Sequence, residues 1–352
     1  MYLPDQAVED PSEEMPSIAI QVTDLGMTYS DGTETVRNVS LEIPAGEFFG
    51  FLGPNGAGKT TVIRMLTTLL QPTTGRITVN GYDVQMDSQS VRQSIGYMAQ
   101  ETVVEPTLTV RENISLACRA YGVPRDERDD RIDDLLDLFD LASKADTPAQ
   151  TLSGGQQKRL DAATALVHEP PIVFLDEPTT GLDPAARNRL WEYFREINRR
   201  GTTVFLTTQY LQEADALCSS LAVIQEGEIV ATGSPADLKA RVGGDVLELS
   251  LDEPSGATVD RARTVIEELG VLAPEETESI QSTPDGLDVT SARAGTIAPD
   301  LLTMLSEAGI ILTGFTVRSP TLDDVFLAIT DGSTRDTTND LREDDERVEE
   351  RR

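Results

Sequence analysis

The stretch Gly53-Pro54-Asn55-Gly56-Ala57-Gly58-Lys59-Thr60 constrains the fold most, because it fits G-x-x-x-x-G-K-[ST], the pattern of a phosphate-binding loop. An apolar run at 48–52 indicates a buried strand before it, and the apolar spacing of 61–70 predicts a helix after it. In that context the glycines let backbone N–H groups turn inward around an anion, and the helix N-terminus adds its positive dipole end. We expect Lys59 to reach the β- and γ-phosphates of a nucleotide and Thr60 to offer a hydroxyl to Mg²⁺. The alternative, a glycine-rich turn that binds nothing, does not account for the strand and helix on either side.

The charge balance of the chain limits which classes of partner it can bind. The 352 residues include 61 acidic and 29 basic side chains, a formal net charge of −32. No extended basic face can be drawn, so we expect no nucleic-acid partner. Such acidity suits either a soluble protein that avoids acidic partners or one adapted to high salt, where screening relieves self-repulsion. The acid excess is spread over the whole chain, which favours the adaptation to salt.

The sequence shows no sign of export or of a membrane span. The two cysteines, Cys118 and Cys218, lack metal-ligand spacing, so we interpret them as small buried residues in a reducing cytoplasm. There is no secretory leader and no run of 18 apolar residues. We expect a soluble chain whose membrane role, if it has one, comes through a partner.

The order of expected elements divides the chain into four parts. Residues 1–16 are acidic, contain prolines and lack a hydrophobic period, so we expect a disordered tail, and the charged residues 331–352 form a second one. Residues 17–243 alternate strands with helices, which indicates an α/β fold with an open, mostly parallel sheet and a helical insertion at about 107–158. Residues 244–330 follow a β-α-β-β-α-β order, which suggests a small α+β, ferredoxin-like domain.

Hydrophobic period and turn residues place the individual elements. In the first domain, strands are expected at 18–22, 36–43, 48–52, 76–81, 94–100, 172–175 and 203–208, with a hairpin at 221–230 and helices at 61–70, 125–139, 156–167 and 185–199. In the second, strands are expected at 246–251, 279–283, 287–291 and 310–318, with helices at 258–269 and 298–308 and a last one from Thr321.

Two adjacent carboxylates, Asp176 and Glu177, end a buried apolar strand. We expect Asp176 to hold Mg²⁺ directly or through water, because the ion prefers oxygen ligands. We expect Glu177 to accept the proton of the attacking water as a general base. The alternative is a pair of exposed carboxylates at a strand end. The phosphate-binding loop earlier in the chain favours the catalytic interpretation.

A second anion site is predicted at Ser153-Gly154-Gly155, where a hydroxyl and free N–H groups meet a helix N-terminus. The first loop already holds one nucleotide's phosphates. A second turn of this kind therefore suggests closure on the nucleotide of another subunit. A plain helix cap is the alternative.

These features together resemble the ABC ATPase family over residues 17–243. Leu152-Ser153-Gly154-Gly155-Gln156 is similar to the family signature, Gln100 to the glutamine of its Q-loop, and Asp183 to the loop after its Asp-Glu strand. The resemblance implies a head-to-tail homodimer with two ATP molecules sandwiched between one subunit's phosphate loop and the other's signature. It also implies that Gln100 touches Mg²⁺ and relays closure to a membrane partner, and that Tyr29 stacks on adenine; a loop tyrosine half-buried for packing is the alternative.

The expected site follows from the motifs and the resemblance. The nucleotide contacts are Tyr29, Gly53, Pro54, Asn55, Gly56, Ala57, Gly58, Lys59, Thr60, Thr61, Gln100, Ser153, Gly154, Gly155, Gln156 and Asp183. The Mg²⁺ contacts are Thr60, Gln100 and Asp176, and the catalytic residues are Glu177, Gln209 and Lys59.

One position departs from the family pattern. The family usually places a histidine after the strand that ends here at Thr208, and this chain has Gln209. Glutamine can hydrogen-bond a γ-phosphate oxygen but cannot carry a proton near neutral pH. The only histidine, His168, lies between the signature helix and the next strand, so we interpret it as structural. Glu177 must then be the base.

Further motifs narrow the resemblance. The segment 207–211, the residues Arg159-Leu160-Asp161 after the signature, and Leu322-Asp323-Asp324-Val325-Phe326-Leu327 are similar to the daunorubicin-resistance type of drug-exporter ATPase. That group works with a separate permease of the ABC-2 kind, which implies an ATP-hydrolysing exporter subunit, peripheral on the cytoplasmic face of the membrane. The acidic composition further suggests that the chain comes from a halophilic prokaryote. Two alternatives stay open: a soluble ABC ATPase acting on ribosomes or DNA, and a regulatory module whose C-terminal domain binds a ligand or locks the dimer.

Overall fold

The computed structural model describes residues 17–241, 244–268, 279–291 and 293–330, which form two compact units. The described part of the first unit runs from residue 17 to Glu213 and from Leu217 to Ile229, and the second holds Ala214–Ala216 and the described residues from Val230 onward. The tails expected at 1–16 and 331–352 lie outside the described residues.

The first unit contains the expected parallel sheet, with strand order β10-β9-β3-β8-β7-β6. The pairs β3–β8, β3–β9, β7–β8 and β6–β7 are parallel. Every residue of β3, β7 and β8 is buried, as expected of strands covered on both faces. The strand bounds are β3 Phe48–Leu52, β6 Ile95–Met98, β7 Ile172–Asp176, β8 Thr203–Thr208, β9 Ser220–Gln225 and β10 Glu228–Gly233.

A separate sheet holds the strands expected at 18–22, 36–43 and 76–81, so these do not join the parallel sheet. Its order is β2-β1-β4-β5, and its strand pairs are antiparallel. The bounds are β1 Ile18–Thr28, β2 Glu34–Pro44, β4 Thr74–Val79 and β5 Tyr82–Asp83. Short connections such as the one between β1 and β2 favour antiparallel pairing, since a parallel neighbour needs a long crossover.

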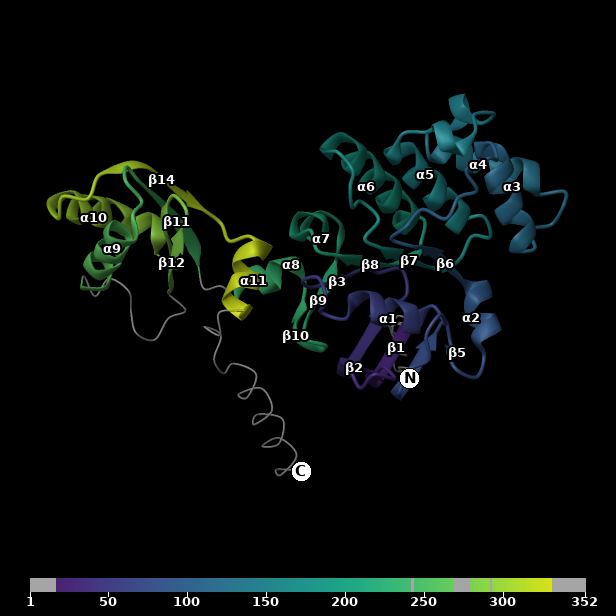
Figure 1. Ribbon diagram of the computed structural model, residues 1–352, viewed down its shortest axis with the longest axis horizontal. Coiled ribbons are helices and arrows are strands. Elements are labelled where there is room, and N and C mark those ends of the chain that lie inside the picture. Colours follow the sequence, from purple (N-terminus) through teal and green to yellow (C-terminus); the bar gives the residue numbers. More distant parts are fainter. Residues whose placement is uncertain (1–16, 242–243, 269–278, 292, 331–352) are drawn as a thin grey trace, which may run out of the picture. The chain divides into compact units, whose positions relative to one another are not determined.

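Helix α1, Lys59–Leu66, lies between the two sheets and shares one hydrophobic core with both. Its Val62, Ile63, Met65 and Leu66 are buried in that core. On the other side of the parallel sheet, Figure 1 shows α3, α4, α5 and α6 grouped together. The other helices in this part of the chain are α2 Ser88–Ser94, α3 Val110–Ala120, α4 Arg128–Leu138, α5 Gly154–Ala165, α6 Pro184–Arg199 and α7 Leu211–Leu217, of which Ala214–Ala216 belong to the second unit. The 3-10 turns Ala142–Lys144 and Ala149–Thr151 connect α4 to α5.

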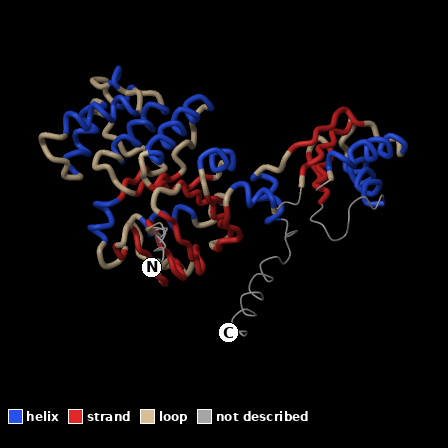
Figure 2. The backbone as a smooth tube through the Cα atoms, turned by 180° about the vertical axis from the view of Figure 1, so that it is seen from behind, coloured by secondary structure: helices blue, strands red, loops and turns tan. Residues whose placement is uncertain are grey.

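The second unit confirms the expected β-α-β-β-α-β order. Its antiparallel sheet has the order β12-β13-β11-β14, which is that of a ferredoxin-like sandwich. Helices α9 and α10 share the hydrophobic core of this sheet (Figure 2). The bounds are α8 Pro235–Ala240, β11 Asp245–Leu251, α9 Gly256–Glu268, β12 Ser279–Thr283, β13 Gly286–Ser291, α10 Ala294–Glu307, β14 Leu312–Arg318 and α11 Leu322–Thr330.

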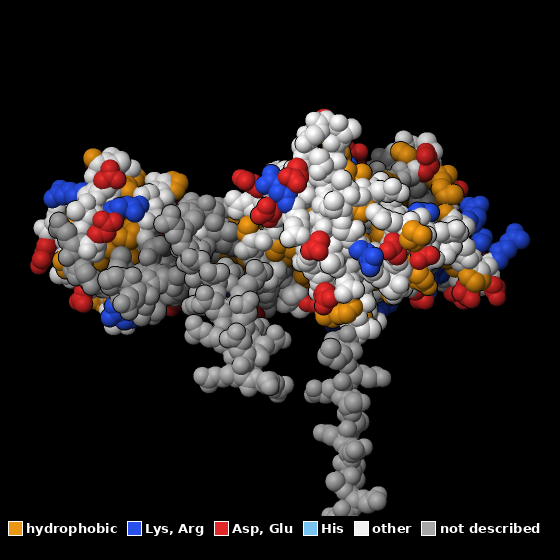
Figure 3. Space-filling model, turned by 90° about the horizontal axis from the view of Figure 1, so that it is seen from below, with side chains coloured by type: hydrophobic (Ala, Val, Ile, Leu, Met, Phe, Trp, Pro, Cys, Tyr) orange, Lys and Arg blue, Asp and Glu red, His pale blue; other side chains and the backbone are white. Residues whose placement is uncertain are grey.

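Charged side chains of both signs are visible on one face of the molecule. On the face drawn in Figure 3, acidic and basic side chains lie interspersed over the coloured part of the surface.

Candidate nucleotide-binding site

The phosphate-binding loop connects β3 to α1, as expected. Gly58 is the N-cap of α1 with φ +110°, a left-handed conformation that side chains rarely adopt. A Cβ at Gly58 would lie 2.8 Å from the carbonyl oxygen of Thr35, and one at Gly53 would lie 2.3 Å from that of Ile224. The loop therefore needs glycine both for its backbone angles and for its close approach to β2 and β9.

Lys59 is buried, with 4% of its surface exposed, and its ammonium lies at the mouth of the loop. Nζ donates to the carbonyl oxygens of Gly53 at 2.8 Å and Pro54 at 3.1 Å, and lies 3.5 Å from Glu177 Oε1. Burial lowers the pKa of Lys59, while the charges of Glu177 and Asp176 oppose that shift. The loop thus presents a cation beside the two carboxylates that the sequence singled out.

Asp176 and Glu177 both lie at the carboxyl end of β7. Asp176 is 1% exposed, and its Oδ1 accepts a hydrogen bond from Thr207 Oγ1 at 2.6 Å. Burial raises the pKa of Asp176, and the hydrogen bond from Thr207 opposes that rise. Glu177 has φ +46°, and its N–H donates to the Thr207 carbonyl oxygen at 3.0 Å. This left-handed residue costs about 1–3 kcal/mol in backbone strain and turns the glutamate out of the strand toward Lys59.

Gln100 joins the same cluster from the end of β6. Its Nε2 donates to Glu177 Oε2 at 3.1 Å, and its carbonyl oxygen accepts a hydrogen bond from Lys158 Nζ at 2.6 Å. Lys158, on α5, is 8% exposed, and burial lowers its pKa. The structure thus unites Lys59, Gln100 and Glu177 from three distant parts of the chain.

Two residues of this cluster were not predicted from the sequence. Thr207 lies opposite Asp176 in the register of β7 and β8, and register between parallel strands is not visible in a sequence. Lys158 did have a signal, because it is one of only four lysines and stands two positions after the signature. Lysine is rarely buried without a partner, so a lysine in a helix expected to pack on the sheet could have been a candidate for contact with the site.

The signature turn acts as a helix cap in this structure. Ser153 Oγ accepts from the N–H of Gln156 at 3.3 Å, and Gln156 Oε1 accepts from the N–H of Ser153 at 2.9 Å, which makes a capping box for α5. Within the described residues, no hydrogen bond or ion pair connects Ser153 or Gln156 to the phosphate loop. Asp183 likewise caps α6, accepting from the N–H of Ala186 at 2.9 Å. The roles of these residues toward a second nucleotide stay predictions.

The remaining predicted residues surround the cluster. Tyr29 is half-buried against the core of the first unit, with its hydroxyl 3.4 Å from Thr61 Oγ1. That is the packing role weighed as its alternative, and adenine stacking stays a prediction. Gln209 is half-buried directly after β8. His168 stacks on Tyr121, with ring centroids 3.9 Å apart, and burial lowers its pKa, which suits a neutral structural histidine.

The cluster fits a nucleoside triphosphate with Mg²⁺. The loop offers a helix N-terminus and a cation to phosphates, and Thr60, Gln100 and Asp176 offer oxygens, the donors that Mg²⁺ prefers. Within the described residues, no three His, Cys, Asp or Glu side chains form a metal cluster.

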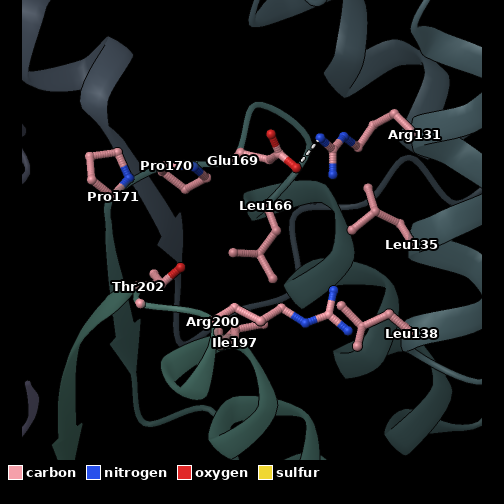
Figure 4. Close-up of a pocket in the computed structure, with 11 residues that line it drawn as sticks. Arg131, Leu135, Leu138, Leu166, Glu169, Pro170, Pro171, Ile197, Arg200 and Thr202 are labelled. Carbon is pink, nitrogen blue, oxygen red and sulfur yellow. Dashed lines mark ion pairs between the residues drawn. The ribbon is translucent and has the colours of Figure 1, made fainter. Parts of the chain in front are cut away.

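A hollow elsewhere in the first unit does not compete for this role. It has a volume of about 300 Å³ and lies between α4, α6 and the segment 166–171 (Figure 4). Its floor is apolar, and its guanidinium groups are paired, Arg131 with Glu169 and Arg200 with Glu196. None of the predicted site residues lines it.

Two family models match the chain. Residues 36–180 match the ABC transporter model, and residues 233–330 match the C-terminal domain of DrrA1-3-like ATP-binding proteins. Together they reach into both units.

Curated relatives match over almost the whole chain. The daunorubicin/doxorubicin resistance ATP-binding protein DrrA of Streptomyces peucetius is 38% identical over 95% of this chain and 98% of its own length. The linearmycin resistance ATP-binding protein LnrL of Bacillus subtilis is 32% identical over 90% of this chain and 100% of its own.

Solved structures agree with this assignment. The cbiO1 protein of Clostridium perfringens, part of an ABC transporter complex, has a TM-score of 0.60 at 27% identity, covering 72% of this chain and 97% of its own. A dimeric ATP-binding cassette in a post-hydrolysis state, bound to ADP and Pi, has a TM-score of 0.56 at 28% identity, covering 61% and 98%. From its phosphate loop to its C-terminal domain, the chain belongs to the DrrA-type ATP-binding proteins of the ABC transporter family.

Proposed function

We propose that the chain hydrolyses ATP as the motor subunit of a drug exporter. The observation that carries this proposal is the cluster of Lys59, Glu177 and Gln100 at the carboxyl ends of the parallel strands. The relatives are named for resistance to daunorubicin, doxorubicin and linearmycin, which supports a role in drug efflux. Neither relative's name supports the ribosome- or DNA-associated alternative.

The residues divide the chemistry among them. The loop N–H groups and Lys59 bind the phosphates, while Thr60, Asp176 and Gln100 hold Mg²⁺, which supplies charge neutralisation on the phosphate oxygens. Glu177, already turned toward this cluster, accepts the proton of the attacking water. Gln209 hydrogen-bonds the γ-phosphate without taking a proton.

The partners extend the same proposal. Two copies form a head-to-tail homodimer, so that Ser153, Gly154, Gly155 and Gln156 of one copy, with Asp183 nearby, complete the other's site. The solved dimeric cassette supports this arrangement. No described helix is long and apolar enough to cross a membrane. The transport path is assigned to a separate permease of the ABC-2 kind, as the match to the DrrA-type proteins implies. The chain would then sit on the cytoplasmic face of the membrane.

Two finer assignments belong to this proposal. Residues 17–243 form the nucleotide-binding domain and 244–330 an accessory domain joined to the exporter role by the DrrA-type match. The net charge of −32, with an acid excess spread over the whole sequence, supports adaptation to high salt and a halophilic source.

The test compares two substitutions in the purified chain. Glu177→Gln is expected to bind and trap ATP but to lower turnover by about 10²-fold or more, because it removes the base. Gln209→Ala is expected to lose only part of the turnover, within about 10-fold, because it removes one neutral hydrogen bond. Glu192→Gln, an exposed glutamate on α6, is the matched control. Equal and mild losses in the first two variants would contradict the assignment of the base.

A further inference from the structure

Glu213, in the first turn of α7, is a fully buried carboxyl that the proposed chemistry does not use. It is 0% exposed, and its Oε1 accepts a hydrogen bond from Trp191 Nε1 at 2.8 Å. Its second oxygen, Oε2, is buried without a hydrogen-bond partner. Glutamate is almost never fully buried unless it is paired, because desolvation of the charge is costly. A buried carboxyl with only one of its two oxygens hydrogen-bonded therefore needs a functional explanation.

The groups that face Glu213 come from three elements. Thr208 ends β8, and Thr179 lies in the loop between β7 and α6; both are 0% exposed. The Thr179 hydroxyl is also buried without a hydrogen-bond partner, and it lies near enough to Glu213 to lower the pKa of that carboxyl, so an unpaired hydroxyl faces a carboxyl with one unpaired oxygen. Arg187 of α6 faces the same group, with its guanidinium carbon 4.7 Å from the ring centroid of Tyr210.

The surroundings of the carboxyl act on its pKa in opposite directions. Burial raises the pKa of Glu213, and the hydroxyls of Thr208 and Thr179, the Trp191 N–H and the Arg187 charge oppose that rise. A threonine hydroxyl and the Trp191 N–H can both donate to this carboxyl.

The two threonines belong to the segments that carry the catalytic groups. Thr179 stands two residues after Glu177, in the segment that ends at Asp183, and Thr208 directly precedes Gln209. Neither threonine is among the nucleotide contacts. A group that contacts both Thr179 and Thr208 fixes the distance between Glu177 and Gln209 indirectly, through the two segments that carry them.

We propose that Glu213 is a positioning residue for ATP hydrolysis, whose buried carboxyl joins the segment after Glu177 to the strand end before Gln209. The inference rests on the proposed ATPase function. Glu213 acts through Thr179 and Thr208 and touches no reacting atom. Closing the open Thr179–Glu213 hydrogen bond aligns the base with the residue beside the γ-phosphate.

The experiment uses the full chain with Glu213→Leu, Glu213→Gln and Thr179→Val, and measures kcat, KM for ATP and the melting temperature. Leu fills the pocket but removes the acceptor of the Trp191 N–H and the carboxyl that faces the two threonines, so kcat is expected to fall by about 10-fold or more with KM changed less than about 2-fold. Gln keeps the shape and the hydrogen bonds, so it is expected to restore kcat to within about 3-fold. Thr179→Val is expected to lower kcat to a similar extent as Glu213→Leu, and the double variant Thr179→Val with Glu213→Leu to lose no more than the worse single one.

The outcomes distinguish a positioning role from a purely structural one. Glu192→Leu on the exposed face of α6 is the matched control and should keep the wild-type kcat. If Glu213→Leu does not fold, Thr179→Val and Glu213→Gln still test the inference, because a normal kcat in Thr179→Val overturns it. Equal losses in Gln and Leu that track the melting temperature also overturn it. A wild-type chain without ATPase activity refutes the proposed function instead, and normal turnover in the Glu213→Leu variant refutes only this inference.

Discussion

Replacing Thr207 by valine tests whether a buried hydroxyl holds Asp176, the carboxylate proposed to bind Mg²⁺, in place. Thr207 is 0% exposed, and its Oγ1 donates to Asp176 Oδ1 at 2.6 Å, the short distance of a charge-assisted bond. Valine has nearly the same shape but no hydroxyl. The variant loses this bond and leaves Asp176, only 1% exposed, without it.

The size of the loss follows from the contacts. A hydrogen bond to a charged group contributes about 1.5–3 kcal/mol to stability, which for a unit of this size corresponds to about 3–12 °C in melting temperature. The N–H of Glu177 also donates to Thr207 Oγ1 at 3.2 Å. In the variant this N–H still donates to the Thr207 carbonyl oxygen at 3.0 Å, so losing the bond to Oγ1 adds little to the cost. Mg²⁺-dependent turnover should need a higher Mg²⁺ concentration, because the carboxylate is less well held.

The loss has a defined pH dependence. Burial raises the pKa of Asp176 in the folded chain above its value in the unfolded chain. Stability from this group is therefore complete below the unfolded pKa and is lost as pH rises through the folded pKa. The Thr207 hydroxyl lowers that folded pKa, so valine raises it and should cost stability mainly at the higher pH values, where Asp176 is charged.

The assay is thermal unfolding of wild type, Thr207→Val and Thr207→Ser from about pH 4, near the ordinary pKa of an aspartate, to about pH 8. Serine keeps the hydroxyl and loses one methyl group, so its cost should be about 1 kcal/mol and independent of pH. The valine deficit should grow with pH. Identical deficits for valine and serine at every pH would refute the reasoning.

Two further predictions concern the loop and the charge. Gly58→Ala should abolish ATP binding, measured by calorimetry, because the residue has φ +110° and its Cβ would lie 2.8 Å from the Thr35 carbonyl oxygen. In the control Gly154→Ala, where a Cβ meets nothing within 4 Å, circular dichroism should show an intact fold. Normal ATP affinity in Gly58→Ala would contradict the loop's role. The melting temperature should rise between about 0.1 M and about 1 M KCl, because screening weakens repulsion among charges that sum to −32; an unchanged value would count against adaptation to salt.

Local signals predicted the elements that position the site. The bounds of β3 and β8 match the sequence expectation, because short apolar runs between turn residues are unambiguous in an α/β chain. The phosphate loop and the two carboxylates followed from spacing and from strand ends. The short α2 and α7 lacked a long period and were not predicted.

What the sequence could not show depends on register and on backbone angles. Thr207 meets Asp176 only because β7 and β8 pair in one register, and Glu213 meets Thr179 only after three elements pack. The φ of +46° at Glu177 is a property of the strand end. The sequence could not predict it, because glutamate rarely adopts a positive φ. Such contacts join residues far apart in the chain.

The position of α1 between two sheets has a consequence for ligand linkage. Because α1 shares one core with both sheets, a nucleotide bound at its N-terminus stabilises the whole first unit against unfolding. At a nucleotide concentration 100 times the dissociation constant, that stabilisation is about 2.7 kcal/mol. The described residues in the core of α9, α10 and their sheet include none of α1. Nucleotide occupancy is therefore expected to raise the free energy of unfolding of the first unit by mass action.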